Sequence, residues 1–182
     1  MQALNDLGYK TIGRKTSRSI LYDWGISLEK INTDPALTAR FQQEISQRKL
    51  DDETQASCSS EIYFTERTHA DLYVYALYAM GMYNGYSDWL DSYYEQCKKN
   101  NNDTYSHIFY LPHGQFKIEA DGVRMHNARY SRAIDRTMRE MTLEMIQQND
   151  YSRSITFIES HSVEDRVKEI TQKLSEITKR DQ

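Results

Sequence analysis

Residues 61–80, EIYFTERTHADLYVYALYAM, contain the strongest fold signal in the sequence. The apolar residues at 62–64 are contiguous, a pattern typical of a strand that is covered on both faces. From residue 72 to residue 79 the apolar residues instead recur at helical spacing. A buried strand that runs directly into a helix is the unit from which parallel sheets covered by helices are built.

The same alternation of strand and helix continues on both sides of this stretch. Further strands are predicted at KTIG (10–13), YSHIFYLP (105–112) and RSITFIE (153–159). Helices are predicted at 1–8, closed by Gly8; at 16–24; at 35–55, opened by Pro35; at 69–81; at 87–99, capped by Ser87; at 128–148; and at 163–179, capped by Ser162. This order predicts an α/β fold, rich in helix, in which a parallel sheet is covered by helices and reactive groups lie at the carboxyl ends of its strands.

Length and composition limit the class of protein. At 182 residues the chain fits one domain, 1–182, and its two prolines and seven glycines favour long helices. The net charge of -4 argues against general nucleic-acid affinity, although a local basic patch stays open. No apolar run reaches the ~20 residues of a membrane helix, and the first residues do not resemble a signal peptide. We therefore expect a cytoplasmic protein without membrane association, in which Cys58 and Cys97 form no disulfide framework.

The most specific local pattern is FTERTHAD (64–71), where the buried strand ends and the helix begins. Glu66 could hold Mg²⁺ directly or through water, because this ion prefers oxygen ligands and keeps several waters. Arg67 offers a planar fork of donors to phosphate oxygens, and Asp71 lies one turn into the helix. The alternative is that Glu66 and Arg67 pair with each other or cap the helix.

Basic residues gather in two other segments. The segment from about 112 to 132 has no clean period, which predicts a loop or flap, and it contains Arg124, Arg129 and Arg132. Their guanidinium groups could converge on a polyphosphate, or they could form a solvated face. The segment GRKTSR (13–18), after the first strand, carries Arg14, Lys15 and Arg18, which suit either an anionic ligand or plain surface charge. The five histidines show no spacing typical of a metal site.

Several separated pieces of the chain agree, in order, with one family. LNDLGYKTI, TSRSIL, IYFTERTHADLYVYA, FYLPHGQFKIEADGVRMHNARYSRAID and SVEDRVKEI resemble the NadR-like AAA-type branch of P-loop nucleotide kinases and NTPases. FTERTHAD is also similar to a Glu-Arg-Ser segment of deoxynucleoside kinases. The resemblance implies a P-loop kinase-like parallel sheet that binds ATP or GTP with magnesium at its carboxyl edge.

The resemblance also implies roles for individual residues. Glu66 would serve the magnesium ion or its water shell, and Arg67 the phosphates, at the catalytic centre. Arg124 would join them from a lid, with Arg129 and Arg132 as further phosphate-binding residues. Arg18 would also contact phosphate, whereas Lys15 and Asp71 would lie on the acceptor side.

Two departures from the family pattern affect the expected activity. The sequence has no G-x-x-x-x-G-K-[ST] motif, so we expect a chain shortened at its N-terminus, without the first strand and the phosphate loop. Relatives also tend to carry a glutamate where this chain has Lys15, and a lysine is a poor general base at neutral pH.

Three functions follow from these patterns. The first is an impaired ATP- or GTP-dependent phosphotransferase whose acceptor is a nucleoside, a nucleotide, a modified base in DNA or nicotinamide riboside. The second is a non-catalytic binding or regulatory protein that keeps the kinase fold. The third is a helical α/β domain whose tyrosine-rich surface contacts a partner. The sequence does not predict the oligomeric state.

Overall fold

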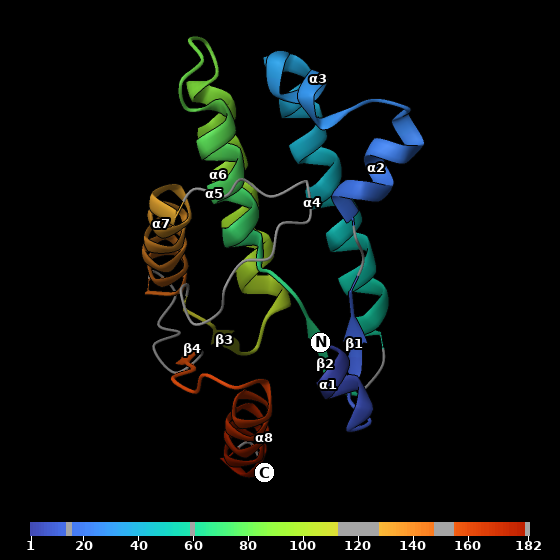
Figure 1. Cartoon of the computed structure of the whole chain (residues 1–182), viewed down its shortest axis with the longest axis vertical. Coiled ribbons are helices and arrows are strands. Elements are labelled where there is room, and N and C mark those ends of the chain that lie inside the picture. The colour runs from blue at the N-terminus through green and yellow to red at the C-terminus, as the bar shows by residue number, and fades with distance from the viewer. Residues whose placement is uncertain (14–15, 59–60, 113–127, 148–154, 181–182) are drawn as a thin grey trace.

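A computed structural model describes residues 1–13, 16–58, 61–112, 128–147 and 155–180 of the chain (Figure 1). Short strands alternate with longer helices, as the sequence predicts. In chain order the elements of the described part are α1 (Gln2–Asp6), β1 (Lys10–Ile12), α2 (Thr16–Trp24), α3 (Leu28–Thr33), α4 (Pro35–Ser57), β2 (Tyr63–Thr65), α5 (His69–Met80), α6 (Ser87–Thr104), β3 (Ile108–Tyr110), α7 (Ala128–Gln147), β4 (Ile155–Phe157) and α8 (Val163–Arg180).

The strands pair in parallel, but in two separate pairs. β1 pairs with β2, so that Thr11 lies opposite Phe64, and β3 pairs with β4 in the same way. The expectation of parallel pairing is therefore confirmed, whereas the described strands form two two-stranded sheets in place of one continuous sheet. Side chains join the pairs, since the rings of Phe64 and Phe109 lie 6.3 Å apart.

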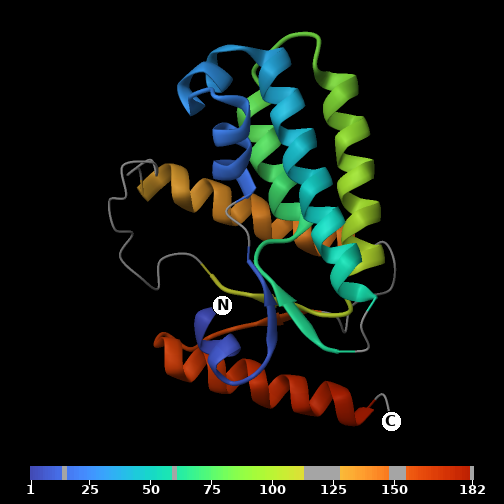
Figure 2. The same ribbon diagram turned by 90° about the vertical axis from the view of Figure 1, so that its right-hand side faces the viewer.

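Helices cover the strands on two sides. Figure 2 shows the strands between α7 on one side and α8 on the other. Beneath the strands, Leu4 of α1 and Ile170 of α8 form a buried cluster with Ile158, against which the rings of Phe64 and Phe109 pack. The strands are thus covered by helices, as the alternating sequence pattern predicts, although they form two sheets.

The larger part of the helical body lies above the strands and has its own cores. Figure 1 shows the long helices α4, α5 and α6 side by side at the end of the molecule opposite α8. Tyr93 and Cys97 of α6 pack with Met145 of α7 and with small residues of α5, all fully buried. A second cluster joins α2, α3 and α4 through Ile20, Ile31 and Phe41, which are at most 4% exposed.

Local sequence signals explain most helix ends, whereas the structure differs from the prediction at α6 and α3. Gly8, with φ +88°, follows α1 in the left-handed conformation that glycine adopts readily. The α6 helix begins at Ser87 itself and Tyr86 precedes it without a side-chain cap, so the predicted Ser87 cap is wrong. The α6 helix also continues through residues 100–104, beyond its predicted end at residue 99, and α3, capped by Ser27, was not predicted.

None of the helices in the described ranges is long and apolar enough to cross a membrane.

Candidate functional site

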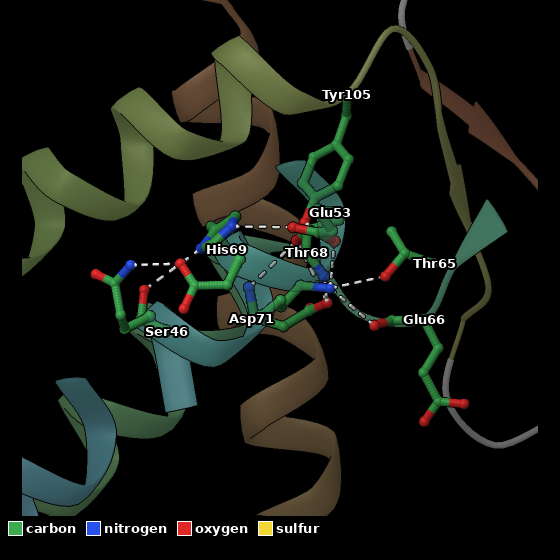
Figure 3. Close-up of polar contacts among 11 residues, drawn as sticks. Ser46, Glu53, Thr65, Glu66, Thr68, His69, Asp71 and Tyr105 are labelled. Atoms are coloured by element: carbon green, nitrogen blue, oxygen red, sulfur yellow. Dashed lines mark hydrogen bonds and ion pairs between the residues drawn. The ribbon is translucent and has the colours of Figure 1, made fainter. Parts of the chain in front are cut away.

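The junction between β2 and α5 presents two exposed charged residues at the carboxyl end of a strand. Glu66 and Arg67 are both exposed, and neither forms a salt bridge within the described residues, so the alternative that they pair with each other is not what the structure has. Arg67 has φ +65°, the left-handed region that costs a non-glycine residue energy. Figure 3 shows the Glu66 carboxylate pointing away from the polar network behind it.

The first turn of α5 is capped by its own side chains. Thr68 Oγ1 accepts a hydrogen bond from the Asp71 backbone N–H, and the Thr68 N–H donates to Asp71 Oδ2 at 2.6 Å. Burial raises the pKa of the Asp71 carboxyl, against the lowering effect of its bonds to Thr68. This capping box gives Asp71 a structural task, and its acceptor-side role stays a prediction.

Behind the junction lies a buried ionic network (Figure 3). Glu53 of α4 is fully buried, and its Oε1 lies 2.6 Å from Lys49 Nζ and accepts a hydrogen bond from the Tyr105 hydroxyl at 2.9 Å. Its Oε2 lies 3.2 Å from His69 Nε2. Burial raises the pKa of the Glu53 carboxyl, but the bond from His69 and the charge and bond of Lys49 outweigh it, so the net pKa lies below the usual value. The carboxylate is therefore charged and fully partnered at neutral pH.

Three residues of this region have the order of contacts found in hydrolase triads. Ser46 Oγ lies 3.5 Å from His69 Nδ1, and His69 Nε2 lies 3.2 Å from Glu53 Oε2. All three residues have no exposed surface. A nucleophile must contact its substrate, so this buried arrangement is a packing element of α4 and α5 and not a hydrolytic centre.

Tyrosines of α5 connect Arg67 with the start of α7. The Arg67 guanidinium lies 4.8 Å from the ring centre of Tyr75, a cation–π contact. One turn further, the ring of Tyr78 lies 5.8 Å from that of Tyr130, and Tyr75 contributes to the raised pKa of Tyr130 after burial. Arg129 and Arg132 are exposed on the first two turns of α7, beside Tyr130.

The other predicted site residues either lie on other helices or fall outside the residues that the structure describes. Arg18 is exposed on α2, the helix that follows β1. Arg14, Lys15 and Arg124 lie outside the described residues, as does most of the predicted flap, residues 113–127. The structure thus brings Glu66, Arg67 and Asp71 together and leaves the lid assignment as a prediction.

The end of β3 meets the same face of the molecule. The Tyr110 hydroxyl donates to Asp135 of α7, and its pKa is raised by burial first, then by Asp135 and by the nearby Asp71. The carboxyl end of β3 is therefore close to the start of α5. Arg139 stacks over Phe157, at the end of β4, at 5.1 Å. The ends of β2, β3 and β4 are all linked to α5 or α7.

A magnesium ion at this site would need ligands besides those that the described residues provide. No group of three or more His, Cys, Asp or Glu side chains within the described ranges is arranged to hold a metal ion. Glu66 offers one carboxylate that forms no salt bridge with the described residues. Magnesium is commonly held by one or two carboxylates together with substrate phosphates and water, so this donor set fits a metal–nucleotide complex.

Two surface hollows of the described part lie away from this junction. One is lined by residues of the turn between α5 and α6, at the end of α5 opposite Glu66, and includes Tyr73, Gly81, Asn84 and Asp91. The other lies between α4 and α6 and is lined by Arg40, Gln43, Glu44, Gln47 and Gln96. Neither of these two hollows includes Glu66 or Arg67, so the candidate site is argued from the chemistry of its side chains.

Sequence reasoning missed Lys49, Glu53 and the role of His69. One signal was available: Glu53 falls at helical spacing on the same side of α4 as the buried residues Ser46 and Ala56. A carboxylate on a buried helix face needs partners, which here come from the next turn, from α5 and from the chain after α6.

Of three comparisons with known proteins, one found a match. No curated protein and no solved structure matches the chain. A family model described as "AAA domain" matches residues 1–166, which include the strands, the β2–α5 junction and the beginning of α8. The chain therefore belongs to the AAA domain family of P-loop NTPases.

Proposed function

We propose that this protein binds a nucleoside triphosphate with Mg²⁺ at the carboxyl end of β2 and is derived from a kinase-like phosphotransferase. The observation that carries the proposal is the exposed pair Glu66 and Arg67, held in a strained turn between a parallel strand and a helix. Sites of α/β folds lie at such strand ends. Membership of the AAA domain family supports a nucleotide as the ligand.

Arg67 and Glu66 bind different parts of a magnesium–polyphosphate complex. Arg67 presents its planar fork to phosphate oxygens, since its guanidinium has no carboxylate partner within the described residues and only stacks on Tyr75. Glu66 contacts the magnesium ion or one of its waters. The bound ion supplies charge neutralisation on the phosphate oxygens. Arg129 and Arg132 lie on the first two turns of α7, where the ring of Tyr130 contacts that of Tyr78 in α5. From there they are suited to bind the outer phosphates.

Phosphoryl transfer adds an acceptor to this site. A nucleoside, a nucleotide or a related compound is the class we propose, with Asp71 and Lys15 on the acceptor side. Catalysis of this reaction consists almost entirely of positioning and charge stabilisation. Because the sequence contains no G-x-x-x-x-G-K-[ST] motif, we expect turnover to be weak compared with kinases that carry this motif.

Calorimetry with MgATP and MgGTP, repeated with EDTA, tests the proposal. Glu66→Gln should abolish the magnesium dependence, whereas Glu61→Gln, an exposed carboxylate at the amino end of the same strand, should not. Arg67→Ala should weaken binding at least tenfold. Arg40→Ala is the matched control, because Arg40 is also exposed and stacks on an aromatic ring, that of Trp24, at 4.7 Å. Equal effects of each variant and its control would contradict the assignment.

The second candidate is a binding or regulatory protein that performs no chemistry. The missing phosphate-loop motif favours it, because nucleotide binding without that loop has fewer contacts and turnover loses its main phosphate anchor. Binding of MgATP without release of ADP in the presence of nucleosides and nucleotides would select this candidate. Transfer of the γ-phosphate to any acceptor would exclude it.

A further inference from the structure

The Lys49 ammonium has a full set of acceptors, and two of them belong to the candidate site. Its Nζ lies 2.6 Å from Glu53 Oε1, 2.9 Å from Thr65 Oγ1 and 3.2 Å from the Glu66 carbonyl oxygen. An ammonium has three N–H donors, so each donor has one acceptor. The Lys49 side chain is 10% exposed and crosses from α4 to the end of β2. It therefore fixes the backbone directly before Arg67.

The conformation of Arg67 needs such a fixed neighbour. Its φ of +65° lies in a region that side chains other than glycine seldom occupy. Strained residues of this kind persist where the surrounding structure determines them more than once. Here the Glu66 carbonyl is held on one side of Arg67 by Lys49, and on the other side the Thr68 N–H is held by Asp71.

The Glu53 carboxylate behind Lys49 is buried and has further partners. Glu53 has no exposed surface and contacts His69 of α5 and the Tyr105 hydroxyl, so these partners fix the carboxylate that Lys49 binds. The Lys49 ammonium also lies 5.8 Å from the centre of the Tyr105 ring. The contacts thus run from the buried Glu53, through Lys49, to Thr65 and the backbone of Glu66 in the exposed turn.

We propose that Lys49 is a positioning residue that holds the Thr65–Thr68 turn in the conformation in which Glu66 and Arg67 meet the metal–nucleotide complex. The proposal rests on the proposed function for the identity of the ligand. Lys49 itself does not touch the ligand, since its three donors are occupied by protein acceptors. Without it, Arg67 relaxes to an ordinary backbone conformation, and the apparent affinity falls with the fraction of chains that keep the competent turn.

Two site variants and two controls separate positioning from general stability. Lys49→Met removes all three contacts, and Thr65→Val removes only one of the acceptors on the turn. Tyr105→Phe removes a donor to Glu53 but leaves the contacts of Lys49 with the turn in place. Lys99→Met removes an equally spaced lysine–carboxylate pair whose side chains are 75% and 62% exposed.

The readouts are MgATP affinity by calorimetry, measured well below each melting temperature, and amide hydrogen exchange of a peptide spanning residues 64–70. Lys49→Met should weaken MgATP binding roughly tenfold and speed exchange in this peptide. Thr65→Val should do both to a smaller extent. Tyr105→Phe should lower the melting temperature with affinity unchanged, and Lys99→Met should alter neither.

The outcomes separate this proposal from the proposed function. Unchanged exchange at 64–70 in Lys49→Met overturns the positioning role, whatever the ligand. Equal losses of affinity in Lys49→Met and Tyr105→Phe overturn it as well, because stability alone would then explain the effect. If the unaltered protein binds neither MgATP nor MgGTP, the proposed function fails, and the exchange measurement still decides whether Lys49 holds the turn.

Discussion

Glu53→Gln should be among the most destabilising conservative changes in this chain. Glutamine keeps the shape of the side chain but removes the charge that Lys49 and His69 face, and it places an amide N–H₂ group against their donors. Breaking a buried ion pair by removing one partner costs about 3–5 kcal/mol. Domains of this size shift in melting temperature by about 2–4 °C per kcal/mol, which gives a decrease of roughly 6–20 °C.

Thermal unfolding followed by circular dichroism measures this effect directly. The matched control is Asp103→Asn, because Asp103 forms the same i,i+4 pair with Lys99 at 2.6 Å but on an exposed surface, where such pairs contribute little. We expect the control to melt within a degree or two of the unaltered protein. If both variants melt at the same temperature, the contacts of Glu53 do not stabilise the fold and the account of the buried network is wrong.

Three further outcomes follow from the described contacts. The pKa of Glu53 is lower in the folded than in the unfolded protein, so its contribution is present at neutral pH and is lost as the pH falls below about 4.5; urea unfolding between pH 3 and 7 should show this loss, and Glu53→Gln should flatten it. Burial raises the pKa of the Cys97 thiol to about 12, so Ellman's reagent should titrate only the exposed Cys58 in the native protein and both thiols in denaturant. Phe41→Ala should lower the free energy of unfolding by about 3–5 kcal/mol in urea, because the ring is buried against Trp24; a loss under 1 kcal/mol would contradict this packing.

Local patterns predicted the elements well because their causes are local. The helical spacing of apolar residues after Thr68, the proline at the start of α4 and the serine before α8 each act within one or two turns. Asn100 and Asn101 misled the sequence reading, because asparagine favours turns, yet both are buried within α6. Tertiary packing there outweighs the local preference.

The same difference between local and tertiary causes applies to the candidate site. The position of Glu66 and Arg67 between a strand and a helix was predicted from sequence, because the end of a strand before a helix is visible as a change of period. The residues that hold them were not, since Lys49 and Glu53 lie 17 and 13 positions earlier and meet the turn only after α4 packs on α5. The positive φ of Arg67 also leaves no signal in an arginine, whereas a glycine at that position would have suggested it.

The shortness of the strands has a consequence for how the protein behaves in concentrated solution. Within the described residues every strand has one strand partner, so each is an edge strand of its two-stranded sheet. Long edges of this kind recruit strands from other molecules and begin aggregation. Each strand here is three residues long, as in β2 and β3, and offers a foreign chain too few hydrogen bonds to dock stably. The short strands of the described part therefore offer little surface for pairing with other molecules.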